Sequence, residues 1–311
     1  MQRHRPVRAT AAAVAAFLLL GGCGSATGAP SGPSPRAAAD PAVPPAAAGE
    51  PSAADTRLLE RAEQILISRC MDGRGFPYAV TEAPEETARS FPYGVDDVEW
   101  ARAHGYGGRD QRAAARARED DPNQRYFRGL SASGRAAART ALMGSAPVGL
   151  SATAPTGMTI TASAEGCIAD AERTLYGDLA TWFRVKVVTM NLRPVRETRV
   201  HEDGQYADAV GQWAACMRAA GRPYADPDAS RQAAARFGEG MPPAEADAAE
   251  AELAVIEATC ATGTPLARVS QALDRTYGDR LRARHREEIA LRWRLQNGAL
   301  ATARRVSQEG A

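Results

Sequence analysis

Four cysteines, set in two copies of one short motif, constrain the fold of this chain more than any other feature. Cys70 begins the stretch C-M-D-G-R-G-F-P-Y and Cys216 begins C-M-R-A-A-G-R-P-Y, so both copies fit C-M-x-x-x-G-x-P-Y. Each copy is followed by one more cysteine, Cys167 or Cys260, and each of these precedes a Tyr-Gly-Asp sequence. Four cysteines allow three pairings, and sequence alone does not select one. The repeat makes Cys70–Cys167 and Cys216–Cys260 the simplest pairing.

The alternative role for these cysteines is a Cys/His metal site. The chain has no C-x-x-C sequence and no histidine at ligand spacing from a cysteine, so we expect no metal site. Loops as long as those closed by the simplest pairing would each add roughly 4 kcal/mol or more to the free energy of unfolding. The sequence therefore predicts two structural disulfides.

Both copies of the motif predict the same local structure. A helix that ends near the glycine can place that residue in the left-handed C-cap conformation, and the proline that follows prevents the helix from continuing. The cysteine then lies in the last turns of the helix, where it can be joined to a second helix. Tyr78 and Tyr224 follow the two prolines. They are candidate contacts for a partner, and packing within the fold is the alternative.

The N-terminus is typical of a bacterial lipoprotein. Arg3, Arg5 and Arg8 precede an uncharged apolar stretch over residues 11–20, which is about half the ~20 residues that span a bilayer as a helix. Leu-Gly-Gly-Cys then ends at Cys23. This sequence resembles a lipoprotein signal, in which the cysteine receives a diacylglyceryl group and becomes the first mature residue. The alternative is an ordinary secretory signal with an incidental cysteine.

The chain therefore divides into three expected segments. Residues 1–22 are expected to be the signal peptide, residues 23–54 a disordered tether of Ala, Pro, Gly and Ser, and residues 55–311 a helical domain. The tether has too little apolar surface to offset its ordering entropy, and as a flexible coil it would reach on the order of 30 Å. Acyl chains on Cys23 would bind membrane lipid and hold the domain at the outer face of the cell membrane. The exported location permits disulfides.

Hydrophobic periodicity predicts a mostly α fold. The motif repeat suggests two related halves, at about 55–190 and 191–311. A small β-hairpin is expected within 147–163, and the pattern over 106–130 is ambiguous. The tryptophans Trp182, Trp213 and Trp293 lie within predicted helices and are expected in the core. The predicted helices cover residues 56–71, 95–104, 132–143, 164–190, 195–220, 243–262 and 264–306.

Charge and motifs indicate neither a nucleic-acid partner nor a catalytic centre. The formal net charge is +1, and loss of three leader arginines leaves the mature chain near −2, without the basic footprint of a nucleic-acid-binding protein. The sequence contains no G-x-S-x-G, H-E-x-x-H or P-loop motif. We therefore name no catalytic residue and no cofactor. Helix capping and solvated helix faces best explain the other polar clusters, which are 201–203, 226–230, 245–252 and the pair His285 and Glu288.

The region around the second motif resembles a family of actinobacterial secreted proteins and lipoproteins. The pattern W-x-x-C-M-x-x-x-G-x-x-Y-x-x-P runs from Trp213 to Pro227, and A-T-C follows at Cys260. Arg222 stands where these relatives have an aromatic residue. The resemblance covers most of residues 55–300 and implies an extracytoplasmic location. It assigns no activity, so it transfers no functional residues.

Two functions remain open from the sequence. We expect a lipid-anchored, non-enzymatic binding or structural module at the cell envelope, with an envelope protein or a cell-wall component as partner. The Arg-rich segment 109–118 would then be a further candidate contact, with a solvated helix face as the alternative. The other function is a cell-envelope hydrolase with a carboxylate pair from distant segments. A deep pocket with two carboxylates in opposed environments would favour the hydrolase.

Overall fold

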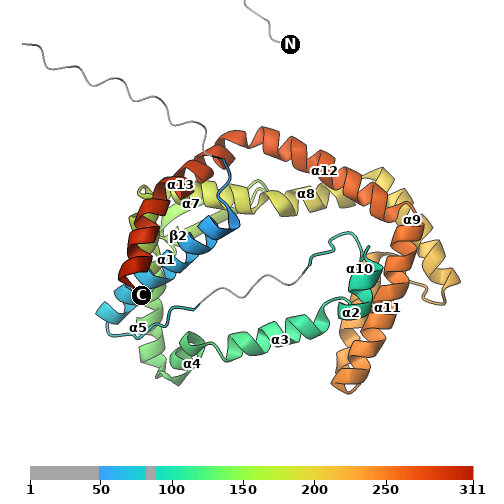
Figure 1. The fold of residues 1–311 in the computed structure, drawn as a ribbon, viewed down its shortest axis with the longest axis horizontal. Coiled ribbons are helices and arrows are strands. Elements are labelled where there is room, and N and C mark those ends of the chain that lie inside the picture. Colours follow the sequence, from blue (N-terminus) through green and yellow to red (C-terminus); the bar gives the residue numbers. More distant parts are fainter. Residues whose placement is uncertain (1–48, 82–88, 311) are drawn as a thin grey trace, which may run out of the picture. The chain divides into compact units, whose positions relative to one another are not determined.

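The computed structural model describes residues 49–81 and 89–310, and most of these residues are helical (Figure 1). This confirms the mostly α fold. The predicted signal peptide, Cys23 and all but the end of the predicted tether lie outside the described residues. None of the helices in the described ranges is both long enough and apolar enough to cross a membrane.

One group of elements encloses a buried cluster that we call the first core. Its largest members include Leu59, Trp182 and Phe183. In Figure 1, α1 and α13 lie side by side, and they are also in contact in the structure. The elements of the first core are α1 (Ala53–Gly73), α5 (Ala132–Met143), β1 (Gly149–Thr153), β2 (Thr159–Ser163), α6 (Cys167–Tyr176), α7 (Leu179–Met190) and α13 (Arg286–Glu309).

A second group encloses the second core, around the fully buried Trp213. The segment 91–95 also packs on this core, next to α11. The elements are α2 (Val98–His104), α8 (Leu192–His201), α9 (Gly204–Ala219), α10 (Pro227–Ala235), the 3-10 helix η1 (Arg236–Glu239), α11 (Pro243–Gly263) and α12 (Leu266–Arg284). Helices α3 (Gly108–Glu119) and α4 (Pro122–Gly129) follow α2 in the ambiguous region.

Several predicted helices are interrupted, each for a local reason. The helix expected over 164–190 breaks into α6 and α7 at Gly177, whose φ is 77°, and Asp178 then caps α7. The helix over 195–220 breaks at Asp203, whose side chain accepts a hydrogen bond from the Gln205 amide at the start of α9. The long helix over 264–306 breaks at His285. Helical apolar periodicity resumes after the breaks, at Leu179, Tyr206 and Ile289, so periodicity alone does not detect them.

The expected hairpin is present as β1 and β2, paired antiparallel with Leu150 opposite Ala162. Leu150 and Ala152 point to the buried side of β1, and the strand contacts α7. Trp182 and Trp213 are buried, as predicted, whereas Trp293 is half-buried.

The described residues belong to one compact unit. Each core contains segments from before and from after residue 190. In the first core α13 packs on α1, and in the second core the segment 91–106 packs on α11. The repeat is therefore best described through its two motifs and their disulfides.

Both motifs end their helices with the same hydrogen bonds. After α1, the Phe76 amide donates to the Met71 carbonyl and the Gly75 amide donates to the Asp72 carbonyl. After α9, Arg222 donates to Met217 and Gly221 donates to Arg218 in the same way. The two glycines have φ values of 82° and 75°. These paired bonds define a Schellman motif, so the predicted left-handed glycine cap is confirmed in both copies.

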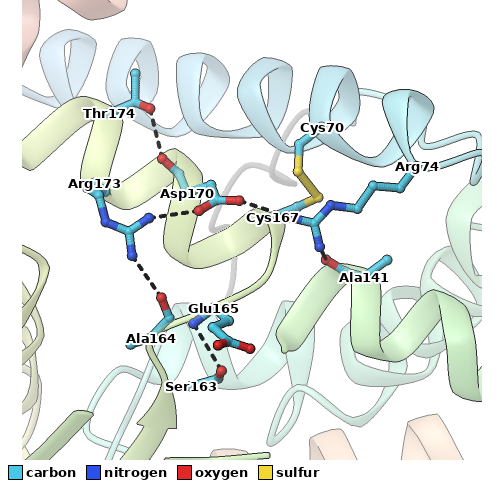
Figure 2. A network of polar contacts seen from close by, with 10 residues as sticks. All are labelled: Cys70, Arg74, Ala141, Ser163, Ala164, Glu165, Cys167, Asp170, Arg173 and Thr174. Atoms are coloured by element: carbon cyan, nitrogen blue, oxygen red, sulfur yellow. Dashed lines mark hydrogen bonds and ion pairs between the residues drawn. A yellow bond between two sulfur atoms is a disulfide. The ribbon is translucent and has the colours of Figure 1, made fainter. Parts of the chain in front are cut away.

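Both predicted disulfides are present. Cys70 is bonded to Cys167, which joins the end of α1 to the start of α6, and Cys216 is bonded to Cys260, which joins α9 to α11. Figure 2 shows the first disulfide beside Arg74, whose guanidinium donates to the Ala141 carbonyl at 3.2 Å.

Candidate functional site

The two motif tyrosines occupy packing positions. Tyr78 packs against the first core and Tyr224 against the second, and both are half-buried. The backbone of Tyr78 is also fixed, because its amide donates to Asp72 and its carbonyl accepts from the Ser68 hydroxyl at 2.6 Å. Packing is therefore their evident structural role.

The Arg-rich segment 109–118 lies within α3, which has no buried residue. Arg112 forms an ion pair with Asp247, and Arg109 donates to the Ala103 carbonyl at 3.1 Å. The remaining arginines of this helix, Arg116 and Arg118, are exposed. The segment is thus a solvated helix that is fixed to the second core at its N-terminal end.

One acidic side chain of the 245–252 cluster is not at the surface. Glu250 is 7 % exposed, and its Oε1 accepts hydrogen bonds from the Tyr106 amide at 2.8 Å and the Gly108 amide at 2.9 Å. The expectation of a solvated face is therefore wrong for Glu250, because the carboxylate fixes the loop between α2 and α3. The same expectation is correct for Glu252, whose exposed carboxylate forms an ion pair with Arg222.

Glu257, two turns further along α11, is completely buried. It accepts hydrogen bonds from the Val95 amide at 2.8 Å and from the hydroxyls of Tyr106 and Ser230. Burial raises the pKa of the Glu257 carboxyl, and the hydrogen bonds from Ser230 and Tyr106 oppose this rise. The Glu257 carboxyl therefore joins three segments of the second core. It is closed to a ligand, because it is completely buried and its hydrogen-bond partners belong to the protein.

The other sequence clusters serve local structure. Asp226 caps α10 by accepting from the Ala229 amide at 2.7 Å, as predicted for a capping turn. His285 Nδ1 lies 3.8 Å from the Glu288 carboxylate. No group of three or more His, Cys, Asp or Glu side chains suited to a metal ion occurs within residues 49–81 and 89–310.

An ionic cluster in the first core has a different character. Glu172 of α6 is 5 % exposed and forms an ion pair with Lys186 of α7, the chain's one lysine. Glu63 of α1 is half-buried near both. Burial, followed by the negative charge of Glu172, raises the pKa of Glu63 to about 7, while Lys186 opposes the rise. The cluster therefore pairs one carboxyl that is protonated near neutral pH with one that is neutralised by an ammonium.

Aromatic and cationic groups border this ionic cluster. Tyr176 stacks on Trp182 with ring centroids 3.6 Å apart, and burial, followed by the charges of Glu63 and Glu172, raises the pKa of the Tyr176 hydroxyl. The buried indole N–H of Trp182 has no hydrogen-bond partner among the described residues. The Lys186 side chain is 28 % exposed, so the cluster reaches solvent on that side.

A groove lies where the segment 90–92 meets α8 and α10, and we call it the α8 groove. Its volume of about 590 Å³ lies within the range of ligand-binding clefts. Most of its lining residues have polar or charged side chains, and both signs of charge are present. The lining residues are Ser90, Pro92, Arg193, Pro194, Glu197, Thr198, His201, Glu202 and Arg231.

The wall of the α8 groove is held by side chains from three helices. Arg193 of α8 donates to the Ser90 hydroxyl and Arg231 of α10 donates to the Phe91 carbonyl, each at 2.5 Å. The Tyr93 hydroxyl donates to Asp274 of α12 at 2.5 Å. The bond from Arg231 fixes the backbone at Phe91, and the other two hold the Ser90 and Tyr93 side chains, so the protein's own contacts preform this wall of the groove.

His201 is the residue of the α8 groove with the most adaptable chemistry. Its ring centroid lies 5.5 Å from that of Tyr93 and 5.0 Å from that of Tyr206. The imidazole is exposed, so it can donate or accept a hydrogen bond depending on its protonation state.

Sequence reasoning did not identify these sites. The ionic cluster brings together residues 63, 172 and 186, and no spacing in the sequence links them. The signal that could have pointed to it is Lys186 itself, a single lysine within the apolar stretch R-V-K-V-V. Such a lysine needs a buried acid as partner.

Comparison of the chain with protein-family models, with curated protein sequences and with solved structures found no match.

Proposed function

We propose that this chain is a lipid-anchored, extracytoplasmic binding module of the cell envelope, and that the α8 groove is its binding site. The observation that carries the proposal is a preformed groove of about 590 Å³ with arginine, glutamate, histidine and hydroxyl groups in its lining. Placement at the outer face of the membrane comes from the signal-like sequence that ends at Cys23.

The lining indicates the chemistry of the ligand. Arg193 and Arg231 supply positive charge, Glu197 and Glu202 supply negative charge, and two prolines and the side-chain stems add apolar surface. Arg193 and Glu197 form an ion pair at 2.6 Å, and Glu202 pairs with Arg199 at 3.2 Å. Such a lining suits a polar ligand that carries both amino and carboxylate groups, because each charge of the ligand can share a charge of these surface pairs. A peptide segment, either of an envelope protein or of the cell wall, has this chemistry.

The test is photocrosslinking on intact cells. A photoreactive amino acid is placed at Thr198, an exposed residue in the α8 groove, and the matched control is placed at Gln212, an exposed residue of α9 outside it. We expect a crosslink to a peptide-containing envelope component from position 198 and none from position 212. Equal crosslinking at both positions, or none at either, contradicts the proposed binding site.

The anchor is tested separately. The wild-type chain should incorporate a labelled fatty acid and fractionate with membranes, and Cys23→Ala should do neither. Label on the Cys23→Ala chain, or no label on the wild type, would show that the signal is an ordinary secretory one.

A second function is favoured by the ionic cluster. Glu63, with a pKa of about 7, has the protonation behaviour of a general acid, and Glu172 forms an ion pair with Lys186. Two carboxyls in opposed environments are the arrangement that a hydrolase of glycosidic or amide bonds would use. Trp182 adds an unsatisfied buried donor next to them.

Hydrolysis is tested with purified cell-wall material and the Cys23→Ala chain. If this second function holds, Glu63→Gln should lower the release of soluble fragments roughly a hundredfold or more, as loss of a general acid does. Glu252→Gln is the control and should retain activity, because Glu252 lies on the exposed face of α11, away from the ionic cluster. If the Cys23→Ala chain releases no more fragments than Glu63→Gln, the ionic cluster has a structural role.

A further inference from the structure

A second groove lies on the first core, between α7 and the start of α13. Its volume is about 650 Å³, and we call it the arginine groove. Arg184 of α7 faces it from one side, while Arg286 and Arg294 of α13 line the other. Ala290 and Leu291 supply apolar surface.

The three arginines of this groove are exposed, and within the described residues none of them forms an ion pair or a hydrogen bond. Their neighbour Arg292 differs, because its guanidinium donates to the Thr189 hydroxyl at 2.7 Å. Each guanidinium has five N–H donors in a fixed fork, so three unpaired arginines at a single groove leave many donors available to an anion.

Two carboxylates also line the arginine groove and limit its positive charge. Glu288 lies 3.8 Å from His285 Nδ1, and Glu287 is exposed. Three arginines against two glutamates leave an excess of one positive charge. The groove therefore suits a singly charged anion that accepts several hydrogen bonds and has an apolar part, which is the chemistry of a phosphodiester joined to glycerol and acyl chains.

The chain enters the described structure next to this groove. The Asn297 side-chain amide donates to the Gly49 carbonyl at 3.0 Å, so the segment that leads back to Cys23 begins beside α13, one turn beyond Arg294. As a flexible tether, that segment would reach on the order of 30 Å. A domain anchored at Cys23 would thus keep the arginine groove within reach of the membrane surface.

We propose that the arginine groove binds the phosphodiester headgroup of an anionic phospholipid in the membrane that carries the chain. This inference rests on the proposed envelope location, and it adds a direct contact between the domain and the membrane surface. It requires no acyl chain on Cys23, so it is measured on the chain that lacks the anchor.

The experiment measures sedimentation of the purified Cys23→Ala chain with lipid vesicles. One set contains phosphatidylcholine alone, and the other contains equal parts of phosphatidylcholine and phosphatidylglycerol. We expect binding to the anionic vesicles, weakened by salt. The added substitutions R184Q, R286Q and R294Q should together reduce the affinity roughly a hundredfold, because each basic residue at an anionic surface contributes about 1 kcal/mol.

The matched control replaces three other exposed arginines without described partners, in R139Q, R218Q and R268Q, and should leave binding within a few-fold of the parent. Equal losses in both triple variants, or equal binding to both vesicle types, overturn the proposal. The proposal is also overturned if a soluble glycerol phosphate polymer displaces the protein from the vesicles and binds it with the same affinity. That result would favour an anionic cell-wall polymer as the ligand. A negative result here leaves the crosslinking at position 198 and the acyl labelling to decide the proposed function on their own.

Discussion

In the second core, Glu257 accepts hydrogen bonds from a backbone amide and two hydroxyls and is completely enclosed, whereas in the first core Glu63 and Glu172 lie with Lys186, whose side chain is partly exposed. Both cores contain the same cysteine motif, the same helix ending and one disulfide. The shared motif therefore does not determine how acidic side chains are used.

The difference follows from the partners of each acid. Neutral donors can satisfy an enclosed carboxyl whether or not it holds a proton, so Glu257 serves to fix the 94–106 segment against α10 and α11. A carboxyl beside another carboxylate and an ammonium has a protonation state that depends on pH. Chemistry that responds to pH is therefore expected at the first core, while the second core supplies rigidity behind the α8 groove.

The largest expected effect is the loss of a disulfide, and it should be similar in the two cores. The bonds close loops with sequence separations of 97 and 44 residues. The chain-entropy model then gives a contribution of about 4–5 kcal/mol from each disulfide to the free energy of unfolding. The contribution of the longer loop is larger by less than about 1 kcal/mol. Chemical denaturation of the Cys70→Ser/Cys167→Ser and Cys216→Ser/Cys260→Ser variants measures these costs. A difference above about 2 kcal/mol would mean that native packing, and not loop closure, sets the cost.

The next effect concerns the enclosed acid of the second core. Glu257→Ala leaves the Val95 amide and the Tyr106 and Ser230 hydroxyls without their acceptor inside the core, and we expect it to lower the free energy of unfolding by about 3–5 kcal/mol. Glu252→Ala, on the exposed face of the same helix, should cost less than about 1 kcal/mol. Similar costs for the two variants would show that the buried network contributes little.

A smaller, pH-dependent effect is expected from Glu63 in the first core. Its pKa of about 7 lies above the ordinary value of 4.5, so the folded state holds this proton more tightly than the unfolded state does. The resulting stability is complete below pH 4.5 and is lost as the pH rises through about 7. Glu63→Gln, which mimics the protonated form, should therefore match the wild type at low pH and exceed it by at most about 3 kcal/mol at pH 8.

The measurement is urea denaturation of both proteins across this pH range. Glu165→Gln, an exposed change just before α6 at a residue that does not influence the pKa of Glu63, is the control and should leave the pH dependence unaltered. Parallel pH profiles for the wild type and Glu63→Gln would contradict the elevated pKa.

Local signals explain most of what the sequence predicted correctly about the fold. The glycine after each Cys-Met determines where α1 and α9 end, and the spacing of the second cysteines indicated both disulfides. Breaks at Gly177, Asp203 and His285 escaped prediction because helical apolar periodicity resumes soon after each of them. The pairing of α1 with α13 is a contact between the two ends of the domain, which no local pattern encodes.

The ionic cluster and the α8 groove were less predictable than the fold, because they too depend on contacts between distant parts of the chain. The local sequence does not distinguish Glu63, Glu172 and Glu257 from acids on solvated helix faces, and tertiary packing alone buries them partly or completely. The α8 groove requires the 90–92 segment to lie against α8, about a hundred residues later in the chain. Long-range contacts of this kind carry no periodic or spacing signal.

The smallest effect tests whether the two helix endings are equivalent. Gly75 and Gly221 have φ values of 82° and 75°, and an added Cβ would meet no atom within 4 Å at either position. Alanine should therefore cost only the backbone strain of the left-handed conformation, about 1–2 kcal/mol at each site. Thermal unfolding of Gly75→Ala and Gly221→Ala should give equal shifts. Unequal shifts in melting temperature would show that the two copies of the motif themselves differ. Equal shifts would show that the helix endings are equivalent, so that the contrast between the two cores comes from their acidic residues.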